Sequence, residues 1–126
     1  MSTLKVNTIQ NTSGVEVYTC KAWVNFDGTF GTSPFTIANN GIREAGNVSS
    51  VTDLSTGQYQ VNFTTPMPHA NYQVTGGVGT LPANTGWADL VILDASAAPS
   101  ASSVRVGTIG YTSWQDSTIV TVSVIC

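Results

Sequence analysis

Apolar and polar residues alternate with a period of two in several separate segments of this chain. In "GQYQVNFTT", the side chains of Tyr59, Val61 and Phe63 share one face of an extended strand. Near the C-terminus, "TIVTVSVIC" repeats the pattern with valine at every second position. Turn sequences separate such segments at intervals of about 8–14 residues, and no segment has the apolar stripe of a helix. The sequence therefore predicts an all-β fold, namely an antiparallel β-sandwich, of which a jelly roll would be one form.

The segment "ADLVILDAS" departs from this alternation because Leu90, Val91, Ile92 and Leu93 are apolar on both faces of a strand. A strand with two apolar faces needs cover on both sides. We therefore predict either a central strand of a sheet or a strand covered by a neighbouring subunit. Residues 95–103 are all Ala, Ser or Pro, and we expect a loop there.

The segment "CKAWVNFD" places one large aromatic side chain on the polar face of a predicted strand. Alternation puts Ala22, Val24 and Phe26 on the apolar face, whereas Trp23 lies among polar residues on the opposite face. In a monomer, such a tryptophan would mark a binding patch. In an oligomer it would anchor an interface, where Trp is enriched. We take Trp23 as a candidate interface residue.

Residues 1–19 precede the first strong strand, and we expect an extended N-terminal arm there, followed by a sandwich domain at 20–126. The arm is polar, and its apolar anchors Leu4, Val6 and Ile9 are candidate interface residues. Alone it can bury little surface, so we expect it to lie on another subunit or on the sandwich. The N-terminus also lacks the apolar region of a secretory signal, so we expect synthesis in the cytoplasm.

Charged residues make up only 9% of the chain, compared with about 25% in an ordinary soluble domain. Few surface charges mean little repulsion between copies, which favours self-association. The four cations are far apart in the sequence, so nucleic acid is not an expected partner. No apolar run approaches the roughly 20 residues of a membrane helix, so we expect no membrane insertion.

The residue types that carry most enzyme and metal chemistry are sparse. The single histidine, His69, stands alone in "TPMPHAN", and Cys20 and Cys126 form no metal-binding pair. The seven acidic residues show no spacing that selects a catalytic pair, and "TGGVGT" lacks the lysine of a phosphate loop. We therefore predict no enzyme activity, no catalytic or metal-binding residues and no cofactor. In a reducing compartment the two cysteines would remain thiols, and a disulfide between them is the alternative.

Aromatic residues near turns give the only hint of a ligand. Trp87, Tyr111 and Trp114 lie in or beside turns and polar strands. Exposed Trp and Tyr stack on sugar rings because they combine an apolar face with a polar edge. These three are candidate ligand-contact residues for a glycan, and the alternative is that they are core or interface aromatics.

The first part of the chain resembles a block that recurs in tail-fibre-like structural proteins of phages of cyanobacteria and other marine bacteria. The resemblance rests on "MSTLKVNTIQNTSG", "KAWVNFDGT" and "IREAGNVSSVTDLSTGQYQVNFTTPMPHANYQV", which keep their order in that family. It covers roughly residues 1–75, and beyond them only a tendency to form strands is shared. The chain departs from long fibres in lacking an extended shaft segment.

This resemblance implies a virion component, either a fibre, a knob or a decoration subunit, which is usually a homotrimer and has no catalytic residues. Its partners would be copies of itself, other virion proteins and a host cell-surface glycan, and its location would be the virion. Two other hypotheses stay open. A carbohydrate-binding module would use the exposed aromatics, and a depolymerase-type enzyme would need paired acids.

Overall fold

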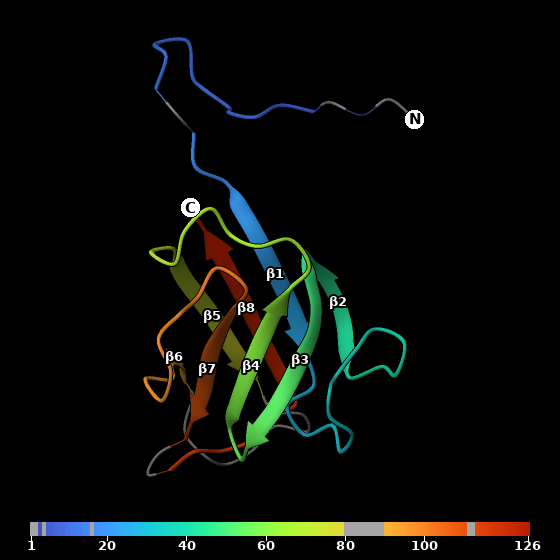
Figure 1. Ribbon diagram of the computed structural model, residues 1–126. Helices are drawn as coiled ribbons and strands as arrows, with labels where there is room; N and C mark the ends of the chain where they lie inside the picture. Colours follow the sequence, from blue (N-terminus) through green and yellow to red (C-terminus); the bar gives the residue numbers. More distant parts are fainter. Residues whose placement is uncertain (1–2, 4, 16, 80–89, 111–112) are drawn as a thin grey trace.

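The computed structural model describes residues 3, 5–15, 17–79, 90–110 and 113–126, within which the chain forms strands and no helix. The strands are β1 (Cys20–Phe26), β2 (Ile42–Gly46), β3 (Val48–Ser55), β4 (Gln58–Phe63), β5 (Gln73–Gly79), β6 (Leu90–Leu93), β7 (Ser103–Ile109) and β8 (Ile119–Ile125). They build two four-stranded antiparallel sheets, with the orders β2-β1-β8-β5 and β3-β4-β7-β6. The sheets pack face to face (Figure 1), which confirms the predicted antiparallel β-sandwich.

The strand order differs from that of a jelly roll. An eight-stranded jelly roll is a long hairpin rolled up, so the first strand pairs with the last, the second with the seventh, and so on. Here only the β1–β8 pair follows that rule, whereas β1–β2, β3–β4 and β6–β7 are pairs of consecutive strands. Among the described strands, half of the strand pairs are therefore local, and the other half join strands far apart in the sequence.

The side chains that alternation assigns to apolar faces fill the space between the sheets. Val24 and Phe26 of β1, and Tyr59 and Val61 of β4, are each at most 1% exposed. The ring of Phe35, from the β1–β2 connection, completes an aromatic cluster, with its centroid 6.0 Å from that of Phe26 and 6.1 Å from that of Tyr59. Burial of these apolar faces is the main force that holds the two sheets together.

A single residue, Asn47, connects β2 of one sheet to β3 of the other. Its φ of 56° lies in the left-handed region, which asparagine tolerates better than most residues. Its side-chain amide donates to the carbonyl oxygens of Lys21 and Thr65, both at 3.0 Å, and its Oδ1 accepts the Thr65 N–H at 2.7 Å. This corner therefore ties the two sheets to each other along one edge of the sandwich.

The prediction of a central strand at Leu90–Leu93 is wrong. Among the strands that the structure describes, β6 pairs with β7 alone and so lies at the edge of its sheet, and the side chain of Leu93 is 49% exposed. The two-sided apolar pattern shows that a strand can bury both faces but does not show how many neighbours it pairs with. The alternative, cover by a neighbouring subunit, stays a prediction. The expected loop follows β6 and ends where β7 begins at Ser103.

The N-terminal arm extends beyond the end of the sandwich at which β1 begins (Figure 1). A turn gives it local order, because Asn11 Oδ1 accepts the N–H groups of Ser13 at 2.9 Å and Val15 at 3.1 Å. The Val17 N–H closes the turn on the Ile9 carbonyl at 2.6 Å. We call the segment that these bonds close, from Ile9 to Val17, the hook. The sequence predicts that the arm lies either on another subunit or on its own sandwich. The structure shows residues 5–15 exposed and beyond the end of the sandwich, so the second of these positions is not observed for them.

Candidate functional site

Trp23 lies on the outer face of the β2-β1-β8-β5 sheet, as alternation predicts, and is 43% exposed. Its cross-strand partner on β2 is Gly46. A Cβ atom built on Gly46 would lie only 2.3 Å from the indole Nε1, so the ring rests directly against the backbone of that glycine. The glycine thus supports one part of the indole and leaves the rest open to solvent.

Small polar residues surround the tryptophan on this face. β8 contributes hydroxyl side chains, β5 contributes a threonine and a glycine, and β1 contributes an amide. We define the Trp23 face by its residues in register on the four strands: Trp23, Asn25, Glu44, Gly46, Thr75, Gly77, Thr121 and Ser123. Glu44, which is exposed opposite Asn25, is the one charged side chain of this set.

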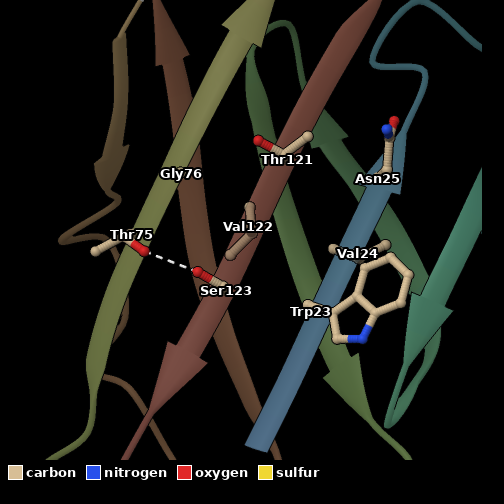
Figure 2. A pocket seen from close by; sticks show the side chains of 8 residues that line it. All are labelled: Trp23, Val24, Asn25, Thr75, Gly76, Thr121, Val122 and Ser123. Atoms are coloured by element: carbon tan, nitrogen blue, oxygen red, sulfur yellow. Dashed lines mark hydrogen bonds between the residues drawn. The ribbon is translucent and has the colours of Figure 1, made fainter. Parts of the chain in front are cut away.

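An open hollow of about 210 Å³ lies on the Trp23 face (Figure 2). It is lined by Trp23, Val24, Asn25, Thr75, Gly76, Thr121, Val122 and Ser123. The hollow follows from side-chain size, because a bulky indole on β1 stands beside short side chains on β8 and β5. An aromatic wall next to a hydroxyl-lined floor can accept an apolar ring face with polar edges, or a flat protein surface of low charge.

Most polar groups of the hollow already have a partner within the sheet. The Thr75 and Ser123 hydroxyls are 2.8 Å apart, and Figure 2 shows this bond spanning β5 and β8. Thr121 Oγ1 accepts the N–H of Gly77 at 3.1 Å. These bonds fix the rotamers of the floor, so the hollow is preformed.

Arg43 fixes one corner of the same sheet. Its guanidinium donates to Asn25 Oδ1 at 3.2 Å and to the Thr118 carbonyl at 2.8 Å. It also lies 4.0 Å from a carboxylate oxygen of Asp27. This exposed ion pair adds little stability, but the hydrogen bonds connect β2, β1 and the segment before β8.

A second hollow, of about 390 Å³, lies where the arm joins the sandwich. It is lined by Tyr18, His69, Asn71, Gln73, Ile125 and Cys126. His69 does not stand free there, because its Nδ1 accepts the N–H of Asn71 at 3.2 Å. Cys20 and Cys126 are both free thiols, so the alternative disulfide does not form.

The most perturbed titratable group is Tyr59, which local sequence reasoning places in the core but gives no polar partner. Its hydroxyl lies 2.7 Å from Asp116 Oδ1 and 2.9 Å from the Gly28 carbonyl. Asp116 Oδ1 also accepts the N–H of Gly57 at 2.7 Å. Burial, and then the bond to Asp116, raises the pKa of Tyr59 well above its ordinary value. Tyr59 is fully buried, so its hydroxyl is closed to solvent, and its bonds tie distant chain segments together.

Carboxylates do not converge on either hollow described above, since neither is lined by an acidic residue. Partial burial of its carboxyl group, and then the nearby charge of Asp116, raise the pKa of Asp53. This residue of β3 is exposed overall and lines neither hollow. Among the described residues, no three His, Cys, Asp or Glu side chains gather closely enough to hold a metal ion. In the same part of the chain, no helix has the length and apolar character needed to cross a membrane.

The structure places the candidate interface residues at separate points. Val6 and Ile9 on the arm are 53% and 48% exposed, and Trp23 is exposed on its sheet face. Leu4 lies outside the described residues. Their role at an interface stays a prediction.

The candidate ligand-contact residues are only partly described. Trp87 and Tyr111 lie outside the described residues. Trp114 is half-buried and covers the outer side of Gly107 on β7, where an added Cβ would lie 2.0 Å from its ring carbon Cζ3. Trp114 therefore belongs to the opposite sheet from Trp23, and its contact with a glycan stays a prediction.

A comparison of this chain with protein families, with curated proteins and with solved structures finds no match.

Proposed function

We propose that the protein is a structural subunit of a phage particle that acts by self-assembly, as a homotrimer, and not by catalysis. The observation that carries this proposal is the arm, which holds its apolar side chains away from the sandwich. Those side chains are Val6, Ile9, Val15 and Val17, with exposed fractions of 53%, 48%, 59% and 43%. Apolar side chains on a segment outside the core are stabilised when another surface covers them.

The Trp23 face supports the same proposal. It combines an exposed indole with mostly uncharged side chains, and charged residues are few in the whole chain at 9%. Aromatic anchors surrounded by uncharged residues are typical of the centre of protein interfaces. The first part of the chain also resembles tail-fibre-like proteins of phages, and for this reason we propose that the subunit belongs to a phage particle.

The proposed mechanism is burial of apolar surface between copies, together with docking of the arm on the virion or on a neighbouring subunit. Three copies would present three equivalent surfaces to a repeated host-cell ligand. Simultaneous contacts increase the overall affinity even when each one is weak.

Light scattering coupled to gel filtration tests the assembly, with the full chain compared to a variant that lacks residues 2–14. We expect the full chain to have the mass of a trimer at micromolar concentration. The shortened chain should fail to join particles while its thermal unfolding stays close to that of the full chain, since the arm lies outside the core. A full chain that is monomeric would contradict the trimer, and normal incorporation of the shortened chain would contradict the docking role.

Carbohydrate binding is a second candidate function, favoured by the hydroxyl-lined hollow beside Trp23. Binding of neutral glycans on an array would be measured for the unaltered protein and for Trp23→Ala, Trp87→Ala and Trp114→Ala. Loss of binding in one of these variants, with an unchanged circular dichroism spectrum, would support a glycan site at that residue. Loss of assembly instead would assign the residue to an interface.

A further inference from the structure

The four edge strands of the sandwich differ in how well they are protected against pairing with another strand. β2 is short and carries Arg43 and Glu44. β3 is covered at its centre, because Phe35 and Val51 exchange backbone hydrogen bonds of 2.7 and 3.0 Å. β6 has only four residues. Charges, cover and shortness are the usual means by which natural sheets prevent the addition of strands.

In the part of the chain that the structure describes, β5 has none of these protections. Its sequence, "QVTGGVG", is seven residues long and contains no charged residue and no proline. It pairs with β8 in an unbroken register from Gln73 to Gly79, without a bulge that would twist the edge away. Among the described residues, no segment hydrogen-bonds to the other edge of β5 through its backbone. An edge that is long, regular and uncharged is a template for an added strand.

We propose that the free edge of β5 receives residues 5–10 of the N-terminal arm from a second copy of this chain. This inference rests on the proposed function and names the surface on which one subunit holds the next. The arm then continues the β2-β1-β8-β5 sheet as a further strand.

The arm and the edge match in length and in charge. Residues 5–10 are six residues, one fewer than β5, and Lys5 is the only charged residue among them. In the structure Val6 and Ile9 of this segment are about half exposed, so they gain cover from any partner. Gly77 and Gly79 have no side chains, which leaves the outer side of the β5 edge bare for branched side chains on the added strand.

A second copy is favoured over the arm of the same chain by the direction that the arm takes. The hook is closed by the bond between Val17 N–H and the Ile9 carbonyl, and Figure 1 shows the segment before it running sideways above the sandwich, in this view toward the side of β2 and not that of β5. Folding back on its own β5 would require the arm to reverse its course. Pairing with a neighbouring subunit requires no such change.

Cysteine cross-linking between differently tagged chains tests the pairing. Both chains carry Cys20→Ser and Cys126→Ser. One also carries Val6→Cys on the arm, and the other carries Thr75→Cys on β5, with Gln73→Cys as a second position in case the register differs. After co-expression and mild oxidation, we expect a disulfide between the two tags.

A matched control places the cysteine on another edge strand, as Ser49→Cys on β3, where Ser49 is exposed. Cross-linking to β5 that is no more frequent than cross-linking to β3 would overturn the inference. A single chain that carries both Val6→Cys and Thr75→Cys and closes a disulfide within itself would also overturn it, because the occupant would then be its own arm.

A charge on the edge gives a second measurement that does not depend on cysteines. Gly79→Lys fits the strand, because the nearest atoms to an added Cβ are those of Ile119 at 3.7 Å. We expect it to weaken self-association by roughly tenfold or more, as an edge lysine opposes strand addition. Gly31→Lys adds the same charge in a loop, where an added Cβ meets nothing within 4 Å, and should leave self-association unchanged.

The two proposals can fail separately. A full chain that light scattering shows to be monomeric removes the proposed function, and this inference with it. A trimer that forms equally well with Gly79→Lys and gives no arm-to-β5 cross-link removes this inference alone.

Discussion

The two outer faces of the sandwich use their polar side chains in different ways. On the β3-β4-β7-β6 sheet, Asn62 Nδ2 donates to Ser50 Oγ at 3.1 Å and to Thr52 Oγ1 at 3.0 Å. Gln60 Nε2 donates to Asn62 Oδ1 at 2.9 Å, and Arg105 Nε donates to Gln60 Oε1 at 3.3 Å. These side chains form a continuous ladder across three strands, and we call this surface the ladder face. The Trp23 face has shorter side chains, fewer such bonds and a hollow.

A tryptophan packed on a glycine occurs on both faces, and the two pairs show the same contrast. Trp114 covers Gly107 and is half-buried, whereas Trp23 leans on Gly46 and is 43% exposed. The comparison teaches that the ladder face is completed by its own side chains. The Trp23 face leaves its aromatic side chain more open to solvent, and we therefore predict that this face gains more from contact with a partner.

The largest effect is expected from Gly107→Ala. An added methyl group would lie 2.0 Å from the Trp114 ring, which is held in a half-buried position. Overpacking of this kind should lower the free energy of unfolding by about 3 kcal/mol, measured by urea denaturation. Gly46→Ala is the matched change on the other face, and it should cost about 1 kcal/mol because the exposed Trp23 can turn away. Equal costs would show that the two tryptophans are held alike.

Tyr59→Phe changes the core between the faces and should cost about 2 kcal/mol, because it leaves Asp116 without its buried donor. It also has a pH signature. The folded-state pKa of Tyr59 is raised above the ordinary 10.0, so the unfolded chain loses this proton first and stability falls as pH rises above about 10. Urea denaturation between pH 8 and 11 should show a shallower fall for Tyr59→Phe than for the unaltered protein. An identical slope in both proteins would rule out this proton as a source of alkaline instability.

Asn62→Ala removes the centre of the ladder. It should lower the free energy of unfolding by about 1 kcal/mol, since several partly buried hydrogen bonds are lost while water replaces some of them. Self-association, measured by sedimentation equilibrium, should not change if the ladder face stays in solvent. A shift in the association constant would show that this face also meets a partner.

Trp23→Ala should have the smallest effect on unfolding, about 0.5 kcal/mol, because the side chain is largely on the surface. The same change should weaken self-association by roughly tenfold or more if the indole anchors an interface. Asn62→Ala and Trp23→Ala therefore separate the two faces most clearly. Asn62→Ala should lower stability without weakening self-association, and Trp23→Ala should weaken self-association with little loss of stability. Association that survives Trp23→Ala would remove this face from the assembly.

Local patterns predicted the strands and their faces because each residue's side is set by its parity along the strand. The core positions of Val24, Phe26 and Tyr59 and the outward position of Trp23 follow from that rule alone. The place of a strand within its sheet does not, because it depends on pairing with distant segments, and the edge position of β6 was missed for that reason. The Tyr59–Asp116 contact was missed likewise, since 57 residues separate its members.

The arm continues directly into β1, and this strand is flanked by β2 on one side and β8 on the other. If this chain is attached to a particle through its arm, a pulling force on the arm would act along the axis of β1. The backbone hydrogen bonds to both neighbours run across that axis, so they are loaded in shear and must give way together. A tether attached to an outermost strand would instead peel its bonds apart one at a time, so the central position of β1 makes the sandwich a firm anchor for whatever the arm holds.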